Sequence, residues 1–402
     1  MRILFLTNEL PYSTVAGGHR LVYLRIKMLL ELGQEVGLAS LLAPGQEAHL
    51  PEMKDILFEL ETAPVRERHV LVRAFHDYIS FYQPAIFWKN YSAELMRKIG
   101  DMVERNKYDV VIAEYSEMGM YLYRNPYLSA VRKVVSCHRC LSTSFANYIQ
   151  GKDLPASLRL KSASQLHKLE RYEFEMYSAM DHILTLTPED RFTLLNYAPE
   201  LPVSVILPGI DFDFFDREAP PKPKEPIVTM CGFFSNKSNN DAALWFIHEA
   251  WPLIRSKHPD LQLHFVGLGM QRELKQAAKN DARILLFGEV DDLRPHRERA
   301  QIFINPMRIG SGLRIKVLEA MATGLPVVST ALGVAGIPVK NGVDCFIADT
   351  PQLMADSIGW LLHDQTLRES MGHAAKKMVR ERYHVRSTAC KLEKLLQEVL
   401  SV

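Results

Sequence analysis

Residues 301–330, QIFINPMRIGSGLRIKVLEAMATGLPVVST, set the architecture of the chain. The apolar run over residues 302–306 predicts a buried strand, and a loop with two glycines follows it. Residues 313–323 are strong helix formers, and a second apolar run begins at Val327. This order predicts a strand–helix–strand unit of a parallel sheet, with its glycine-rich turn at the edge where such sheets bind ligands.

The charges at the start of this predicted helix run against the helix dipole. A helix N-terminus carries about half a positive charge, so a cation there costs about 0.3–1 kcal/mol. Arg308, Arg314 and Lys316 nevertheless precede the first acidic residue, Glu319. A polyanion bound at the exposed N–H groups would remove this cost, whereas the structural alternative is an ordinary helix with solvated cations.

The spacing of the turn and the helix fits a nucleotide diphosphate. Gly310 and Gly312 would let a phosphate approach the backbone closely. At about 100° per residue, Gly312, Lys316 and Glu319 share one helical face. The helical rise places Glu319 roughly 10 Å beyond the phosphate end, which matches the reach from a diphosphate to its ribose hydroxyls.

The pattern P-x-x-x-G-S-G-x-R-x-K-V-L-E-A-M-A-x-G-x-P-V-V-S-T spans residues 306–330. It resembles the donor-nucleotide signature of the family 4 retaining glycosyltransferases, which have the α/β GT-B fold. The resemblance implies that Glu319 is the second acid of the family's Glu–seven–Glu motif and bonds the ribose. The first acid falls at Ser311, so the donor sugar stays open. Arg314 and Lys316 resemble a sub-group with Gly-Ser-Gly in place of Glu-Gly-Phe-Gly.

Other donor-binding residues are expected in the C-terminal half. A strand over residues 227–232 ends in Gly232, which would let the loop backbone approach the diphosphate, and Lys237 could reach it as a point charge. An amphipathic helix is predicted after this loop, over residues 241–255. The resemblance implies that Gly288 and Val290 abut the nucleobase through backbone groups. The predicted donor-binding set is Gly232, Lys237, Gly288, Val290, Gly310, Ser311, Gly312, Leu313 and Glu319.

The N-terminal half opens with a strand–loop–helix–strand pattern. Residues 2–7 predict a buried strand, and a loop with Gly17 and Gly18 precedes an amphipathic helix that ends before Gly33. The loop lacks G-x-G-x-x-G, which argues against a dinucleotide site, and it resembles the family's first loop, which faces the cleft and the acceptor. The alternative is an ordinary turn that needs glycine for a positive φ.

His138 follows a predicted strand over residues 133–137, at the kind of strand end where α/β sheets place functional groups. Further strands are predicted over residues 109–113, 182–187 and 203–207, which indicates a parallel sheet covered on both faces. The resemblance implies that a histidine near this point lies close to the transferred sugar, and the alternative is a structural hydrogen-bond donor. The predicted catalytic set is His138, Arg314 and Lys316.

The composition shifts once along the chain, at a run with four prolines over residues 217–226. With the family resemblance it predicts two Rossmann-like domains facing across a cleft. They are an acceptor domain over residues 1–210 and a nucleotide-sugar domain over residues 224–383, joined by a linker over residues 211–223. The resemblance also implies that a terminal helix over about residues 384–402 packs back on the first domain.

The charge and composition of the chain limit the classes of binding partner that we expect. A formal charge of +1 and a pI near 7.7 argue against a nucleic-acid binder. Five scattered cysteines fit a reducing compartment, and no apolar run is long enough to span a membrane, so we expect a cytoplasmic protein. Aromatic and basic residues over residues 69–99 leave peripheral membrane contact open, the alternative being that the aromatics pack inward.

These features predict a retaining transfer of a sugar from a UDP- or GDP-linked donor to a hydroxyl of a glycan, lipid-linked or small-molecule acceptor. No cofactor or metal is expected, because the only Asp-x-Asp, Asp211-Phe-Asp213, lies in the linker. One alternative is a nucleotide-sugar-binding protein that has lost catalysis, suggested by Ser311. Another is an NAD-dependent oxidoreductase, disfavoured by the missing G-x-G-x-x-G.

Overall fold

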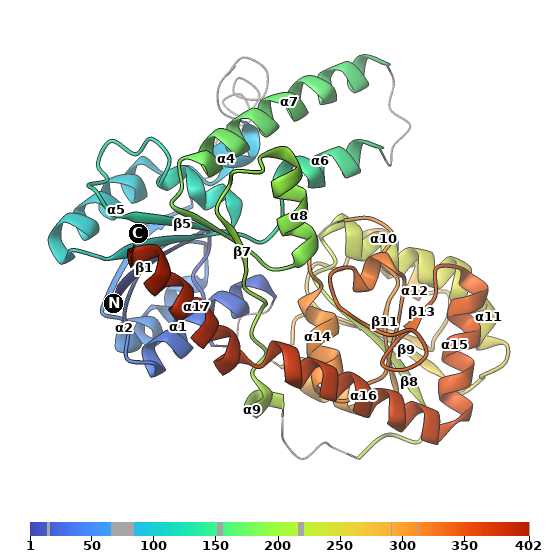
Figure 1. The fold of residues 1–402 in the computed structure, drawn as a ribbon. Helices are drawn as coiled ribbons and strands as arrows, with labels where there is room; N and C mark the ends of the chain where they lie inside the picture. Colours follow the sequence, from blue (N-terminus) through green and yellow to red (C-terminus); the bar gives the residue numbers. More distant parts are fainter. Residues whose placement is uncertain are drawn as a thin grey trace. The chain divides into compact units, whose positions relative to one another are not determined.

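The structure is a computed structural model that describes residues 1–13, 17–65, 84–150, 156–215, 221–290, 292–310 and 312–401. These residues form two compact units. Met1–Gly209 and Val385–Val402 make up the first unit, and Ile210–His384 make up the second. Each unit is a parallel β-sheet with helices on both of its faces (Figure 1).

The sheet of the first unit has seven strands in the order β3-β2-β1-β4-β5-β6-β7, all of them parallel. The order reverses direction between β1 and β4, and α/β sheets bind ligands at such a switch point, outside the carboxyl ends of the strands. The strands are β1 (Arg2–Thr7), β2 (Glu35–Leu42), β3 (Glu59–Pro64), β4 (Val110–Glu114), β5 (Arg132–Cys137), β6 (His182–Thr185) and β7 (Val203–Val205).

Alternate side chains of these strands enter two separate cores, as the twofold period of a strand requires. Leu4 and Leu6 pack with α5, η2 and α7 on one face, and Ile3 and Phe5 pack with α1, α2 and α17 on the other. The terminal helix α17 lies along α1 (Figure 1). The helices are α1 (Gly18–Glu31), η1 (Gln46–His49), α2 (Leu50–Ile56), α4 (Ala85–Lys89), α5 (Ala93–Asn106), η2 (Ser116–Tyr121), α6 (Leu141–Gln150), α7 (Ala156–Ser178), α8 (Pro188–Tyr197) and α17 (Val385–Ser401).

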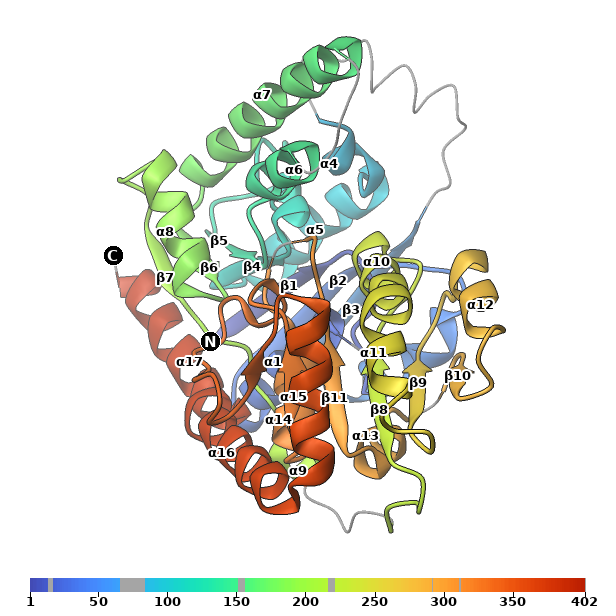
Figure 2. The same ribbon diagram turned by 90° about the vertical axis from the view of Figure 1, so that its right-hand side faces the viewer.

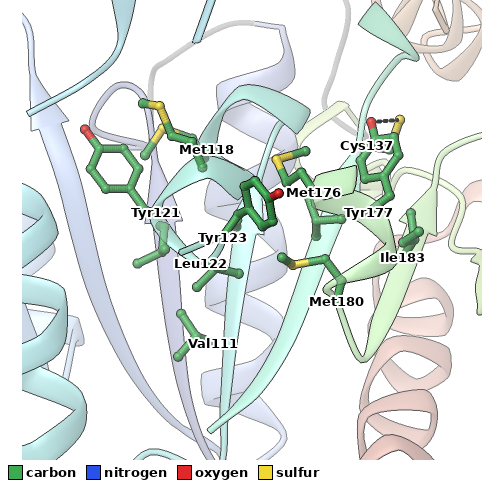
Figure 3. Close-up of a cluster of buried hydrophobic side chains, with 14 of the residues drawn as sticks. Val111, Met118, Tyr121, Leu122, Tyr123, Cys137, Met176, Tyr177, Met180 and Ile183 are labelled. Atoms are coloured by element: carbon green, nitrogen blue, oxygen red, sulfur yellow. Dashed lines mark hydrogen bonds between the residues drawn. The ribbon is translucent and has the colours of Figure 1, made fainter. Parts of the chain in front are cut away.

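Figure 3 shows the part of the first core that α7 covers. Met176 and Tyr177 of α7 lie against the side chains of η2 and of the sheet. The Tyr177 hydroxyl lies within hydrogen-bond distance of Cys137 Sγ, at 3.3 Å, and of the buried carboxylate of Glu173, at 2.9 Å. Cys137 is therefore a buried structural thiol at the end of β5, and burial raises its pKa further.

The sheet of the second unit has six parallel strands in the order β10-β9-β8-β11-β12-β13, so its switch point lies between β8 and β11. The predicted strand–helix–strand unit supplies β11, α14 and β12. The strands are β8 (Ile227–Cys231), β9 (Gln262–Val266), β10 (Ile284–Phe287), β11 (Ile302–Asn305), β12 (Val327–Ser329) and β13 (Phe346–Ile347).

Helices α10, α11, α12 and α15 pack on one face of this sheet, whereas α14 contacts β11 and α16 (Figure 2). A π-helical turn over Phe246–Ala250 precedes Pro252, whose ring lacks the N–H group that a regular helix would use. The helices are α9 (Phe212–Phe215), α10 (Lys237–Trp245), η3 (Phe246–Ala250), α11 (Trp251–Arg255), α12 (Arg272–Ala278), α13 (Arg294–Arg299), α14 (Ile315–Ala322), η4 (Leu332–Val334), α15 (Pro351–His363) and α16 (Gln365–Tyr383).

Two helix starts differ from the sequence prediction. α10 begins at Lys237 rather than near Asp241, because the Asn236 side chain caps it by accepting from Ser238 N at 2.9 Å. α14 begins at Ile315 rather than at Leu313, because Arg314 has a φ of −93° and a ψ of 82°, outside the helical range. Both helix N-termini lie at the carboxyl edge of the second sheet.

Candidate active site

Two loops meet at the switch point of the second sheet. One follows β8 and begins with Gly232, and the other follows β11 and contains Gly310 and Gly312. The turn after β9 supports the first loop from behind: a Cβ atom at Gly267 would collide with the Gly232 carbonyl, and one at Gly269 would lie 2.8 Å from Ser235 N. Glycine is therefore required for this close packing of backbone on backbone.

Lys316, in the first turn of α14, lies at the centre of this edge. Its Nζ atom donates to Asn239 Oδ1 of α10 at 2.8 Å and lies 3.9 Å from Met307 Sδ. Among the described residues, no carboxylate forms an ion pair with it. Burial, assisted by the charge of Arg314, lowers the pKa of Lys316 to about 7. Lys316 is thus a half-buried cation that an incoming anion would stabilise.

Asn239 is a residue of this site that the sequence analysis missed. Its Nδ2 donates to the Phe233 carbonyl at 2.9 Å, which leaves Oδ1 to face Lys316. A Cβ atom at Gly232 would lie 3.1 Å from the same Nδ2. A lone Asn in a polar loop carries no signal of its own, and only the fold shows that it touches both Lys316 and the Gly232 loop.

Arg314 precedes α14 and turns back over the glycine loop. Its Nη1 donates to the Gly312 carbonyl at 2.6 Å, and a Cβ atom at Gly310 would lie 3.3 Å from its Nη2 and 3.0 Å from Ser238 Oγ. The loop after β11 therefore packs against the start of α10. Leu313 lies in this loop as a half-buried residue, and Ser311 lies outside the described residues.

The structure corrects two parts of the expected charge pattern. Gly312 precedes α14 and so does not share a helical face with Lys316 and Glu319. Arg308 pairs with Asp241 of α10 at 2.7 Å, so the fold already compensates its charge. Arg314 and Lys316 instead bond neutral oxygens, the Gly312 carbonyl and the Asn239 side-chain amide.

Glu319 lies one turn further along α14 and pairs with a second residue that sequence reasoning missed. Arg297 Nη2 of α13 donates to Glu319 Oε2 at 2.6 Å, and both side chains are buried. No hydrogen bond to the other carboxylate oxygen, Oε1, occurs within the described part of the chain. Arg297 fixes the orientation of the carboxylate and leaves Oε1 as an acceptor.

The remaining predicted donor residues lie around this centre. Lys237 is the exposed first residue of α10, two positions before Asn239. Gly288 and Val290 follow β10, which β9 separates from β8. A Cβ atom at Gly288 would meet nothing within 4 Å, so its position is open.

The first unit brings His138 together with Glu114 at the carboxyl ends of β4 and β5. His138 Nε2 lies 2.7 Å from Glu114 Oε2, and Arg25 Nη1 of α1 donates to both oxygens of Glu114, at 2.8 and 3.0 Å. Although burial opposes ionisation, the charge of Arg25 and the hydrogen bond with His138 lower the pKa of Glu114 to about 2. Glu114 is therefore a buried, ionised carboxylate.

Tyr115 connects His138 to the glycine loop before α1. Its ring lies against the His138 ring with centroids 4.2 Å apart, and its hydroxyl is 3.3 Å from His19 Nδ1. A Cβ atom at Gly18 would lie 2.8 Å from that hydroxyl, whereas Gly17 has a φ of 69° and open space around it. Tyr115 itself has a φ of 73°, and such strain in a non-glycine residue concentrates at functional sites.

The described residues contain neither a candidate metal site nor a candidate membrane-spanning helix. No group of three or more His, Cys, Asp or Glu side chains in the described part of the chain is placed to hold a metal ion. None of the described helices combines the length and the apolar character needed to cross a membrane.

Comparison with known proteins links the second sheet to a family. Residues 225–364 match the model of the family "Glycosyl transferases group 1". The matched residues lie within the second unit. The match covers the glycine loops, Asn239, Lys316 and Glu319, and it supports glycosyl transfer as the activity.

Two related proteins are similar in sequence to half of this chain or more. The chain is 22% identical over 370 residues to an uncharacterised 44.6 kDa protein in the cps region of Klebsiella pneumoniae, covering 89% of this chain and 90% of that protein. It is 27% identical over 223 residues to a GDP-mannose-dependent α-(1-6)-phosphatidylinositol monomannoside mannosyltransferase of Mycolicibacterium smegmatis, covering 50% of this chain and 57% of that protein.

The crystal structure of HepE from Anabaena, in complex with UDP and glucose, matches the fold of the whole chain. The TM-score is 0.70 at 15% identity, and the match covers 98% of this chain and 99% of that one. The fold is GT-B, with two Rossmann-like units that each contain a parallel sheet.

Proposed function

We propose that this chain is a retaining glycosyltransferase that moves a sugar from a UDP- or GDP-linked donor to a hydroxyl group of an acceptor. Lys316 carries the proposal: it is a half-buried ammonium at the start of α14, bonded to an amide of the α10 first turn rather than to a carboxylate. A diphosphate would supply an anion to this cation, which pairs with no carboxylate of the described residues, and two helix N-termini favour the same charge.

Glu319 Oε1 is the proposed ribose acceptor. It belongs to the same helix as Lys316, and Arg297 already holds the other carboxylate oxygen. Gly232, Gly310 and Gly312 would allow the loop backbones to approach the phosphates, and Gly288 and Val290 would border the base. These assignments rest on the resemblance of the sequence, and they are supported by the loops after β8, β10 and β11, which all follow the carboxyl ends of parallel strands of the second sheet.

In the proposed reaction, the bond between the anomeric carbon and the diphosphate oxygen breaks. The acceptor oxygen bonds to that carbon on the same face of the sugar, and the hydroxyl proton passes to the leaving phosphate. Lys316 and Arg314 stabilise the charge that develops on the diphosphate, which is the main task in such transfers, and no metal or cofactor is required.

The names of the similar proteins suggest candidate donors and acceptors. The mannosyltransferase relative uses GDP-mannose by its name, and HepE holds UDP and glucose, so both bases are candidate donors. The Klebsiella relative is encoded in a cps region, which supports a place in polysaccharide biosynthesis and a glycan or lipid-linked acceptor.

A second candidate is a nucleotide-sugar-binding protein without catalysis. Ser311 stands where the family has an acid that helps to hold the donor sugar, and this departure favours the candidate. The two functions share one donor site and differ in turnover.

Donor hydrolysis separates the candidates. The purified protein is incubated with UDP-glucose or GDP-mannose, with and without EDTA, and free nucleotide is measured. Slow release that persists in EDTA is expected, and Lys316→Met should abolish it while Lys275→Met, an exposed lysine of α12, should not. Tight binding without any release would instead support the non-catalytic protein, and no binding of either donor would contradict both.

A further inference from the structure

The hydrogen bond between His138 and Glu114 determines which imidazole nitrogen carries a proton. An ionised carboxylate can only accept hydrogen bonds. Glu114 is ionised and lies 2.7 Å from His138 Nε2, so Nε2 must be the donor. In the neutral imidazole, the second nitrogen Nδ1 then has no proton and carries a lone pair.

Three elements hold the carboxylate in this role. Glu114 ends β4 and is fully buried. Arg25, from α1, donates to both of its oxygens and also to Ser136 Oγ of β5, at 2.8 Å. Arg25 thereby keeps Glu114 ionised. Among the described residues, His138 is the other side chain that donates to this carboxylate.

Nδ1 of His138 is a polar atom to which no described residue forms a hydrogen bond, and it is not fully buried. The His138 side chain is 10% exposed, and no described residue forms a hydrogen bond with Nδ1. The charged and titratable groups that face the ring are Glu114 and Tyr115 from the end of β4, Arg25 and His19 from α1, and Asp190 from α8.

We propose that Glu114, held by Arg25, is a positioning residue that fixes His138 as the Nε2–H tautomer, so that Nδ1 accepts a hydrogen bond from a hydroxyl group of an acceptor bound in the first unit. An acceptor hydroxyl suits this nitrogen, because the hydroxyl is the donor that a neutral Nδ1 requires. The role of His138 Nδ1 in turnover rests on the proposed function, whereas the assignment of the tautomer does not.

The test needs a variant that removes the carboxylate without leaving a buried charge. Glu114→Leu alone would leave the buried Arg25 guanidinium without its carboxylate partner. Arg25→Met/Glu114→Leu removes both partners of the ion pair, a change that proteins often tolerate. Glu114→Gln is the conservative variant, because its amide oxygen can still accept from Nε2. Glu173→Gln is the matched control: Glu173 is an equally buried carboxylate of the same unit, bonded to Leu141 N, Ser142 N and Tyr177.

Long-range ¹H–¹⁵N spectra of the full chain labelled with ¹⁵N-histidine report the tautomer of His138, and His138→Asn assigns its signal. Wild type, Glu114→Gln and Glu173→Gln should show the Nε2–H form, and the double variant should show a mixture of both tautomers. A thermal melt confirms that each variant folds. A proton on Nδ1 in the wild type, or an unchanged tautomer in the double variant, overturns the proposal.

Ligand additions locate the hydroxyl. Because an acceptor is the proposed source, UDP-glucose and GDP-mannose should leave the Nδ1 signal unshifted, and a shift with either donor would overturn the assignment to an acceptor. The double variant should lose at least tenfold in turnover. No loss of turnover in that variant would overturn the role of Nδ1. A wild type that neither binds nor hydrolyses a donor would contradict the proposed function and leave the tautomer result standing.

Discussion

Lys316 Nζ lies 2.8 Å from Asn239 Oδ1, and this bond joins the first turn of α14 to the first turn of α10 across the switch point of the second sheet. Each of these helices lacks an acidic residue in its first turn. Two positive helix ends and one ammonium therefore converge with a neutral amide between them, an arrangement that favours a bound anion.

Donor binding should depend on pH through Lys316. Its pKa of about 7 in the free protein means that the ammonium loses its proton as the pH rises above 7. A diphosphate binds the protonated form, so affinity for UDP-glucose or GDP-mannose should fall above pH 7, by up to about tenfold per pH unit for one linked proton. Calorimetric titration from pH 6 to 9 measures this. Lys316→Arg, which stays charged, should give a flat profile, and an equally steep profile in that variant would remove Lys316 as the cause.

The lowered pKa of Lys316 should also make the free energy of unfolding depend on pH. Between about pH 7 and the ordinary lysine pKa of 10.5, the unfolded chain binds a proton at this position that the folded chain has lost. The contribution of Lys316 to the free energy of unfolding should therefore rise with pH across this window. Chemical denaturation at pH 7 and pH 9 should show a smaller rise in Lys316→Met than in the wild type.

Asn239→Asp should convert the anion site into an internal ion pair. The new carboxylate would occupy the place of Oδ1, beside Lys316, and would raise the pKa of that lysine. It would also repel the donor diphosphate, so the dissociation constant for UDP or GDP should increase at least tenfold. Asn280→Asp, at an exposed position after α12, is the control and should leave binding unchanged. Equal affinity in the two variants would place the diphosphate elsewhere.

Glu319 combines a structural and a binding role that two variants can separate. Glu319→Ala leaves the buried Arg297 unpaired and should lower the free energy of unfolding by about 3–5 kcal/mol. Arg297→Met/Glu319→Leu removes both charges and should regain most of that stability. Donor binding, measured by calorimetry, should remain weak in both variants, because neither has a ribose acceptor at this position. Restored binding in the double variant would show that Glu319 acts only on the fold.

Hydrophobic patterning was enough to predict strands such as β1, β8 and β11, because they are buried and consist mostly of apolar residues. β3 was missed, since Glu59 and Glu61 alternate along it as befits an edge strand that is not buried on both faces. The start of α10 was also missed, because its cap depends on a single Asn side chain.

The candidate site was predictable where residues are close in sequence and not where they are brought together by the fold. Lys316 and Glu319 belong to one helix, so their spacing was legible. Their partners Asn239 and Arg297 lie on other helices, at separations of 77 and 22 residues. The pairing of Glu114 with Arg25, which gives His138 its context, spans 89 residues and has no local signal.

Gly267 offers a test of the close backbone packing behind the Gly232 loop. It has a φ of 136°, and a Cβ atom there would collide with the Gly232 carbonyl oxygen. Gly342 is a matched control in the same unit, with a φ of 78° and open space where a Cβ atom would lie. Both Gly→Ala variants should lose about 1–2 kcal/mol from the positive φ alone. Gly267→Ala should lose more and should also weaken UDP binding, because the Gly232 loop must move. Equal losses in denaturant titrations, with donor affinity intact, would show that the loop tolerates the displacement.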